Sequence, residues 1–171
     1  IERWLRANRK DIFISKIADT RGQLESVVHG IRIFKKQYDQ QIEDFAIFNG
    51  DTIRKIEFIV PSRDYPWIEV TRASGTHWSF VDVIGKVSRV VEKNRISELC
   101  STGLYYFPSF KDFMEQLQHS CYLTEFSGES FVAPFYQILI DSGVPVYSFF
   151  EALENFDFCG TPDEYFATAQ K

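Results

Sequence analysis

The sequence has few cysteines and no long apolar run. Its three cysteines are widely spaced and form no Cys-x-x-Cys or Cys/His cluster: they are Cys100, Cys121 and Cys159. Such a set argues against a disulfide framework and a structural zinc site, and it favours a reducing compartment. No stretch of about 18 apolar residues occurs, the length that a membrane-spanning helix needs. We therefore expect a cytoplasmic protein without a membrane partner.

An excess of positive charge is also lacking. The chain carries 24 acidic and 19 basic residues, a formal net charge of -5, so we expect no nucleic acid among its partners. Its 44% hydrophobic and 25% charged residues exclude a disordered or coiled-coil chain, and 171 residues fit one domain. Aromatic residues make up 16% of the chain, with 17 phenylalanines, and most of them must lie in a core.

The first part of the chain predicts a strand–helix–strand unit. Residues 2–8 are typical of a helix end, and residues 12–17 alternate as in a strand. A helix is expected after Thr20 as N-cap, with Gln23 as its capping-box partner and apolar residues at helical spacing up to Phe34. Residues 45–48 form a short apolar run typical of a buried parallel strand. This order predicts a parallel sheet with helices on its faces.

Further along, the pattern changes to short strands separated by turns. Residues 56–60, 67–71, 78–83 and 87–91 predict antiparallel hairpins, and residues 102–107 predict another strand. Ser109 and Asp112 are expected to cap a helix. A helix over 131–140 closed by Gly143, a strand over 144–149 and a last helix opened by Thr161-Pro162-Asp163-Glu164 follow. The predicted fold class is α/β, a Rossmann-like mixed sheet flanked by helices with an antiparallel β-hairpin insertion.

Asp51 is the strongest single candidate for a functional residue. It follows Asn49-Gly50 directly after the predicted strand over 45–48. In open α/β sheets, ligands bind beyond the carboxyl ends of the strands. A carboxylate there can hold Mg²⁺, which bridges phosphate oxygens. The alternative is a simple turn, because Asn-Gly-Asp is a common way to leave a strand.

Glu92 and Lys93 form a second candidate at the end of the predicted strand over 87–91. Lys93 can neutralise a phosphate, and Glu92 can accept hydrogen bonds from hydroxyl groups. The alternative is a solvated charge pair at a strand end. Asn94, Arg95 and Ser97 extend the polar run along the same edge.

The other polar candidates carry weaker signals. Gly22 is suited to a close approach of backbone and ligand at a helix N-terminus, and His77-Trp78-Ser79 can line a pocket, although tryptophans mostly pack in cores. None of the three histidines has a second ligand at metal spacing. Cys100 has no histidine near it in sequence, so we expect an inert thiol.

Taken together, these elements resemble the nucleotidyltransferases that activate phosphorylated sugars and related small phosphates. The resemblance is closest to the branch of capsule and lipopolysaccharide biosynthesis and covers nearly the whole chain. It runs through Thr20-Arg21-Gly22-Gln23, Phe48-Asn49-Gly50-Asp51-Thr52, His77-Trp78-Ser79-Phe80, Glu92-Lys93-Asn94-Arg95-Ile96-Ser97, Ser101-Thr102-Gly103-Leu104-Tyr105-Tyr106-Phe107, Glu129-Ser130-Phe131-Val132-Ala133-Pro134 and Cys159-Gly160-Thr161-Pro162-Asp163-Glu164-Tyr165.

The resemblance implies an Mg²⁺-dependent enzyme that joins a nucleoside triphosphate (CTP, UTP, GTP or dTTP) and a phosphorylated small molecule, with release of pyrophosphate. Asp51 matches the family's metal-binding aspartate, and Lys93 matches the lysine that faces the acceptor phosphate. The remaining matches are to substrate-binding positions, near the nucleobase for Gly22 and Gln23 and around the acceptor for Glu92, Thr102, Gly103 and Glu129. Trp78 and Ser79 are further candidate substrate-binding residues. A homo-oligomer is left open.

Two departures from the family pattern matter. The glycine-rich triphosphate loop, Gly-x-Gly-x-Arg followed by Pro-Lys, does not occur in these 171 residues. We therefore expect a single nucleotidyltransferase-like domain over residues 1–171 that is N-terminally incomplete and inactive alone. In many relatives a second metal-binding aspartate stands where this chain has Phe158, which makes Asp157 the candidate second ligand.

Two other classes of protein fit the same residues. In a metal-dependent nucleotide-sugar glycosyltransferase, Asn49-Gly50-Asp51 would be a variant of the Asp-x-Asp motif. A non-catalytic nucleotide-binding domain would retain the fold without the reaction. Pyrophosphate release distinguishes the nucleotidyltransferase from the glycosyltransferase. A Gly-x-Gly-x-Arg segment upstream in the reading frame would distinguish it from the non-catalytic domain.

Overall fold

A computed structural model describes residues 7, 12–38, 42–120, 125, 126 and 128–170. The predicted helix end over residues 2–8 lies almost entirely outside this part of the chain, as does Cys121. The helices are α2 (Gln23–Gln37), α3 (Phe110–Ser120), α4 (Ala133–Asp141), α5 (Pro162–Ala169) and the 3-10 helix η2 (Leu153–Asn155). The strands are β1 (Phe45–Phe48), β2 (Thr52–Arg54), β3 (Trp67–Arg72), β4 (Ser79–Ile84), β5 (Lys86–Glu92), β6 (Leu99–Phe107), β7 (Glu125–Phe126), β8 (Glu129–Ser130), β9 (Tyr147–Phe150) and β10 (Phe156–Phe158).

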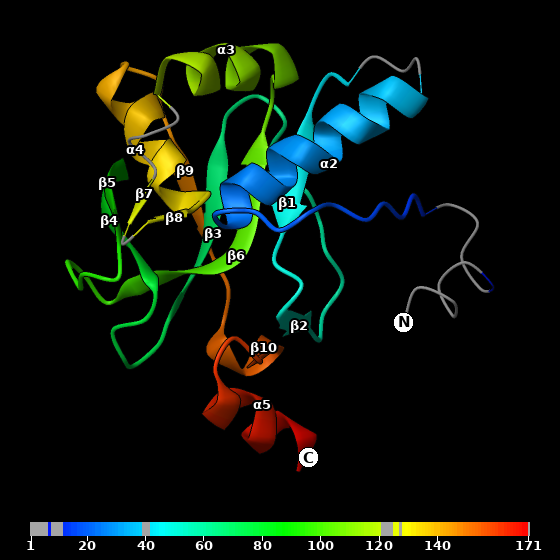
Figure 1. Ribbon diagram of the computed structural model, residues 1–171. Coiled ribbons are helices and arrows are strands. Elements are labelled where there is room, and N and C mark those ends of the chain that lie inside the picture. Colours follow the sequence, from blue (N-terminus) through cyan, green and yellow to red (C-terminus); the bar gives the residue numbers. More distant parts are fainter. Residues whose placement is uncertain (1–6, 8–11, 39–41, 121–124, 127, 171) are drawn as a thin grey trace.

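A six-stranded mixed sheet organises the chain, in the order β5-β4-β6-β3-β9, with β1 also paired to β6 (Figure 1). Strand β6 is the central strand because it pairs with β3, β4 and β1. Nearly all of its residues are buried. Only the β3–β9 pair of this sheet is parallel. The predicted α/β class with a mixed sheet is confirmed, and the β4–β5 hairpin is continuous with that sheet.

The predicted parallel strand–helix–strand unit is wrong. Residues 45–48 do form a strand, but β1 runs antiparallel to β6, with Phe45 opposite Phe107 and Phe48 opposite Leu104. Only Ile47 of this strand is buried. A short apolar run does not specify the direction of its partner, and here the partner is a strand more than 50 positions later.

Two other predicted strands are absent from the described residues. Neither residues 12–17 nor residues 56–60 form a strand, although both contain alternating apolar side chains. The ring of Phe58 packs 6.1 Å from that of Trp67, and Val60 joins the same cluster. These side chains therefore cover one face of the sheet and do not extend it.

The helix ends follow the predicted capping chemistry except in α2. Thr161 and Glu164 form the expected capping box at α5, and the Asp112 backbone N–H donates to Ser109 Oγ at 3.1 Å. The N-cap of α2 is Gly22, and Thr20 Oγ1 instead donates to the Gly22 carbonyl at 3.2 Å. Thr20 is therefore not the predicted N-cap.

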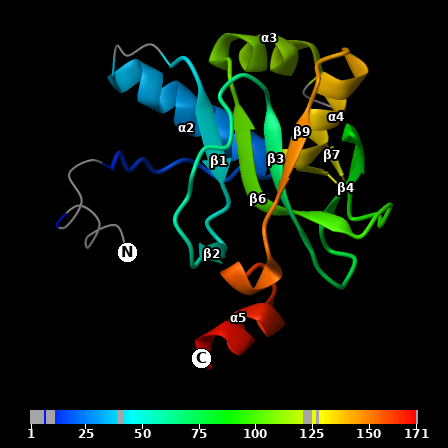
Figure 2. The ribbon, with the colours of Figure 1, turned by 180° about the vertical axis from the view of Figure 1, so that it is seen from behind.

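Helices α2 and α4 lie on the same face of the sheet (Figure 1). Leu24 and Val28 of α2 and Phe135 of α4 belong to the main hydrophobic core. Figure 2 shows the sheet from behind. A second hydrophobic cluster, separate from the main core, contains Trp67, Leu104 and Tyr106. The pair β2–β10 and helix α5 form a separate layer at one end of the sheet. No described helix is long and apolar enough to span a membrane.

Tyr136 ties α4 to the two central strands. Its side chain is fully buried, and its hydroxyl lies 2.7 Å from the Trp67 carbonyl oxygen and 3.0 Å from that of Tyr106. Burial raises the pKa of Tyr136 well above its ordinary value, so the hydroxyl keeps its proton and can donate it.

We expect Tyr136→Phe to lower the free energy of unfolding by about 1–3 kcal/mol, because it removes a buried hydrogen bond while keeping the ring. Urea unfolding measures this change. The matched control is Tyr165→Phe, since Tyr165 is 57% exposed. An equal effect of the two substitutions would contradict the assigned role of the Tyr136 hydroxyl.

Candidate functional site

A cavity of about 500 Å³ opens at the end of the sheet that faces α5. Segments far apart in the sequence converge on it. Its described lining includes every site residue predicted from the sequence except Asp157: Gly22, Gln23, Asp51, Trp78, Ser79, Glu92, Lys93, Thr102, Gly103 and Glu129. The motifs that stand in order along the chain thus surround one space.

The floor of the cavity is a bulge in β6. The register against β3 shifts between the pairs Ile68–Tyr105 and Val70–Ser101, so β6 has extra residues at this point. Gly103 has a φ of 89° there, and a Cβ on it would lie 2.7 Å from the Asn49 side chain. A glycine is required, because other residues are strained at this φ and would collide with Asn49.

Gln23 fixes the position of Asn49. Its Nε2 donates to Asn49 Oδ1, and its Oε1 accepts from the Val132 N–H at 3.2 Å. The Asn49 N–H in turn donates to the Gly103 carbonyl at 3.0 Å. The predicted capping-box role of Gln23 is wrong, because its side chain joins α2, the end of β1 and the start of α4.

The conformation of Gly22 serves a contact within the protein. Its φ is 135°, and a Cβ there would lie 2.6 Å from the backbone N and O of Ser130. The Ser130 N–H also donates to the Arg21 carbonyl at 2.7 Å. Although Gly22 lines the cavity, the close approach that demands a glycine is to β8.

The Asp51 carboxylate faces the turn before α5. The Cys159 N–H donates to the Asp51 carbonyl at 2.8 Å, which holds the two turns together. A Cβ built on Gly160 would lie 3.2 Å from Asp51 Oδ2 and 3.7 Å from Glu164 Oε2. Both carboxylates therefore border the same glycine at the rim of the cavity.

Two contacts between cavity-lining residues join the β3–β4 loop to β10 and α5. His77 Nε2 lies 3.1 Å from Glu164 Oε1, and the rings of Trp78 and Phe158 meet edge to face at 4.7 Å. Arg95 Nη2 donates to the carbonyls of Ala73 and Gly75 at 2.7 and 2.8 Å and so anchors the loop. The prediction that His77 can line a pocket is confirmed. The sequence did not predict its contact with Glu164 or the contact of Asn49 with Gln23, because these partners are distant along the chain.

Glu92 and Lys93 project from the end of β5. Glu92 is buried and accepts a hydrogen bond from Ser79 Oγ. Burial raises the pKa of Glu92 above its ordinary value, opposed by that hydrogen bond and by Lys93. The Lys93 ammonium lies 3.7 Å from Glu129 Oε2 and 4.5 Å above the ring of Phe131.

Lys93 has a backbone φ of 53°, and it is the one non-glycine residue with positive φ in the described ranges. This conformation costs a side-chain-bearing residue about 1–3 kcal/mol and is concentrated at functional sites. Its N–H donates to the Trp78 carbonyl at 2.9 Å, which stabilises the turn.

Asp157 lies outside this cavity. It is opposite Ile53 in the β2–β10 pair, and its Oδ1 is 2.9 Å from Lys55 Nζ. Within the part of the chain that the structure describes, no group of three His, Cys, Asp or Glu side chains is arranged to hold a metal ion.

Comparison with known proteins gave matches among solved structures. A scan of protein-family models and a search of curated proteins found no match. The nucleoside-diphosphate-sugar pyrophosphorylase from Vibrio cholerae RC9 is 33% identical over 99% of this chain and 74% of its own, with a TM-score of 0.84. The UTP-bound UGPase from Acinetobacter baumannii is 17% identical over 99% and 65% of the two chains, with a TM-score of 0.60.

HddC from Yersinia pseudotuberculosis is 18% identical over 99% of this chain and 72% of its own, with a TM-score of 0.59. This likeness and that of the UGPase show a shared fold. The mixed sheet is therefore an arrangement that this chain shares with both proteins. The higher identity and coverage of the Vibrio protein go further: this chain belongs to the family of nucleoside-diphosphate-sugar pyrophosphorylases.

The Gly22 contact gives a test of the site's construction. We expect Gly22→Ala to lower the free energy of unfolding by at least about 1 kcal/mol, because of its left-handed backbone and the approach of Ser130. Gly30→Ala, in the middle of α2 with nothing within 4 Å of the added Cβ, should raise it by up to about 1 kcal/mol. Thermal and urea unfolding measure both changes. If the two substitutions changed the free energy of unfolding in the same direction, the packing of Gly22 against Ser130 would be contradicted.

Proposed function

We propose that this protein transfers a nucleoside monophosphate from a nucleoside triphosphate to a phosphorylated sugar or similar small phosphate. An acceptor phosphate oxygen bonds to the α-phosphorus, the bond from that phosphorus to the bridging oxygen breaks, and pyrophosphate leaves. The observation that carries the proposal is the convergence of Asp51, Glu92 and Lys93 on one cavity. Catalysis of such a transfer depends mainly on positioning and on neutralising charge.

The charges in the cavity favour Mg²⁺ as cofactor. Lys93 is the single lysine or arginine among the described lining residues, whereas Asp51, Glu92, Glu129 and Glu164 are acidic. A triphosphate and a second phosphate need more positive charge than one ammonium supplies. Mg²⁺ commonly binds through one or two carboxylates plus substrate phosphates, and the Asp51 carboxylate fits that requirement. When bound, the ion would neutralise phosphate charge.

The acceptor is proposed to lie between Lys93 and the β6 bulge. Lys93 would face its phosphate, with Glu129 as the residue that holds the ammonium in place. Glu92, oriented by Ser79, would accept hydrogen bonds from acceptor hydroxyls above Thr102 and Gly103. Gly22, Gln23 and Trp78 would border the nucleotide. Asp157 has no role in this proposal, since it pairs with Lys55.

The biological setting is part of the same proposal. Nucleoside-diphosphate products of this kind supply surface-polysaccharide synthesis, such as that of capsule or lipopolysaccharide, from the cytoplasm. CTP, UTP, GTP and dTTP are all candidate nucleotides. The chain spans 74% of the length of the Vibrio relative, so activity is proposed for the full-length protein.

Asp51→Asn tests the metal-binding assignment. We expect the turnover number for pyrophosphate release to fall by about 10²–10³, the usual cost of removing a group that stabilises developing charge, while thermal unfolding is unchanged. The control is Asp64→Asn, an exposed residue that does not line the cavity. Normal turnover of the Asp51 variant with unchanged Mg²⁺ dependence would show that Asp51 is a turn residue and does not bind the metal.

Lys93→Met separates the two substrates. Loss of a charged hydrogen-bonding partner costs about 1.5–3 kcal/mol, so the apparent affinity for the phosphorylated acceptor should fall about tenfold to a hundredfold, with little change for the triphosphate. Lys86→Met is the matched control, because Lys86 also lies over an aromatic ring, 5.7 Å from that of Tyr147. Equal loss for both substrates would refute an acceptor-side role.

A further inference from the structure

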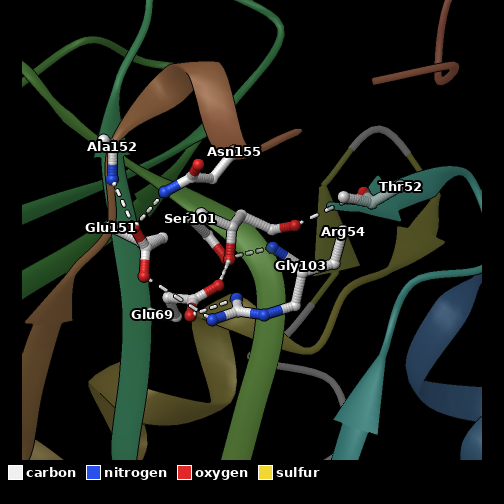
Figure 3. Close-up of polar contacts among 9 residues, drawn as sticks. Thr52, Arg54, Glu69, Ser101, Gly103, Glu151, Ala152 and Asn155 are labelled. Atoms are coloured by element: carbon white, nitrogen blue, oxygen red, sulfur yellow. Dashed lines mark hydrogen bonds and ion pairs between the residues drawn. The ribbon is translucent and has the colours of Figure 1, made fainter. Parts of the chain in front are cut away.

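A buried ion pair lies directly beneath the cavity. Arg54 Nη1 donates to Glu69 Oε1 at 2.5 Å, and the two side chains are 12% and 7% exposed. The second guanidinium nitrogen, Nη2, lies 3.6 Å from Glu151 Oε2. Figure 3 shows these side chains clustered between β2, β3 and the chain after β9.

The second oxygen of Glu69 reaches the cavity floor. Glu69 Oε2 accepts from Thr102 Oγ1 at 2.7 Å, and the Thr102 hydroxyl is buried. Glu69 stands in β3 at the position where the register against β6 shifts. The carboxylate thus holds the bulge that carries Gly103, whose N–H donates to Ser101 Oγ at 3.0 Å.

The other end of the ion pair reaches the Asp51 turn. Arg54 is the last residue of β2, which begins directly after Asp51. Thr52 Oγ1 in the same strand donates to the Thr102 carbonyl at 3.3 Å. Two links, one through Thr52 and one through Arg54 and Glu69, therefore join the Asp51 strand to the same residue of β6.

The remaining contacts fix Glu151, and with it the segment that leads to β10. Glu151 Oε1 accepts from Asn155 Nδ2 at 2.7 Å and from the Ala152 N–H at 2.9 Å. These hydrogen bonds hold the pKa of Glu151 below its ordinary value, so it stays charged beside Arg54.

Such an arrangement is poorly explained by stability alone. Burying an ion pair is often no better for stability than apolar packing of the same volume. Arg54 Nε is buried and has no hydrogen-bond partner among the described residues, which adds to the cost. What the pair supplies is a fixed geometry between two segments of the cavity wall.

We propose that Arg54 and Glu69 are positioning residues that align the Asp51 turn with the Thr102–Gly103 bulge for the transfer step. This inference rests on the proposed function. Neither side chain lines the cavity, so each acts through a residue that does. A misplacement of about 1 Å between reacting groups can cost a hundredfold in rate.

The test is Glu69→Gln in the full-length protein, which keeps the shape of the side chain and removes its charge. We expect kcat for pyrophosphate release to fall about tenfold to a hundredfold, with both KM values within about threefold because no substrate contact is lost. The matched control is Glu98→Gln. Glu98 also pairs with an arginine of β3, Arg72 at 3.6 Å, but both side chains are exposed. The kcat of the Glu98→Gln variant should therefore be unchanged.

Thr102→Val provides an independent variant that leaves the Arg54–Glu69 pair intact. The kcat of the Thr102→Val variant should also fall. The kcat of the double variant with Glu69→Gln should fall by less than the product of the two single effects, since both substitutions interrupt the same connection from Arg54 through Glu69 to Thr102. A merely structural role would lower the unfolding temperature and leave kcat per folded molecule unchanged. This comparison holds even if the Glu69 variant fails to fold, because Thr102→Val alone must then show the fall in kcat.

The outcomes separate the two proposals. Absence of nucleotidyl transfer by the wild-type protein, across the candidate triphosphates and sugar phosphates, would overturn the proposed function. An active wild type with unchanged kcat in Glu69→Gln or in Thr102→Val would overturn the positioning role and leave the proposed function standing. A fall in kcat with the predicted non-additivity supports both.

Discussion

The packing of the Asn49 side chain against the Cα of Gly103 is the contact on which the site depends. It requires a left-handed glycine, since a Cβ at Gly103 would lie 2.7 Å from Asn49. Asn49 is held in turn by Gln23 of α2. The helix on one face, the edge strand β1 and the central strand β6 therefore meet at one point, and the directions of the Asp51 turn and of the β6 bulge follow from it.

Polar groups are layered around this point according to their access to the cavity. Lys93 and Glu129 face the opening, Glu92 is buried beside Ser79, and the Arg54–Glu69 pair lies below the floor. The outer charges can meet a ligand, whereas the inner ones meet only protein. Electrostatic preorganisation of this kind needs both layers, because a charged group is useful to a reaction only when its position is fixed before the substrate arrives.

The sequence predicted which residues line the cavity better than it predicted the strand directions and contacts that bring them together. Asp51 comes shortly after β1, and Glu92 and Lys93 stand at the end of β5, so local patterns indicate that each of them lies at a strand end. The antiparallel direction of β1 depends on a partner far along the chain, and so do the contacts of His77 with Glu164 and of Gln23 with Asn49. No local periodicity contains such information. Residues 56–60 illustrate the same limit, since their apolar side chains cover Trp67 without forming a ladder.

The fate of the nucleotide's phosphorus atoms tests the proposed transfer directly. The full-length protein would be incubated with Mg²⁺, a sugar phosphate and a triphosphate labelled with ³²P at either the α or the γ position. If the proposed transfer takes place, the α label enters the nucleoside-diphosphate product and the γ label leaves in pyrophosphate, with equal amounts of the two products. Transfer of the γ label to the sugar phosphate, or turnover of the triphosphate with no α label in a sugar nucleotide, would contradict this transfer.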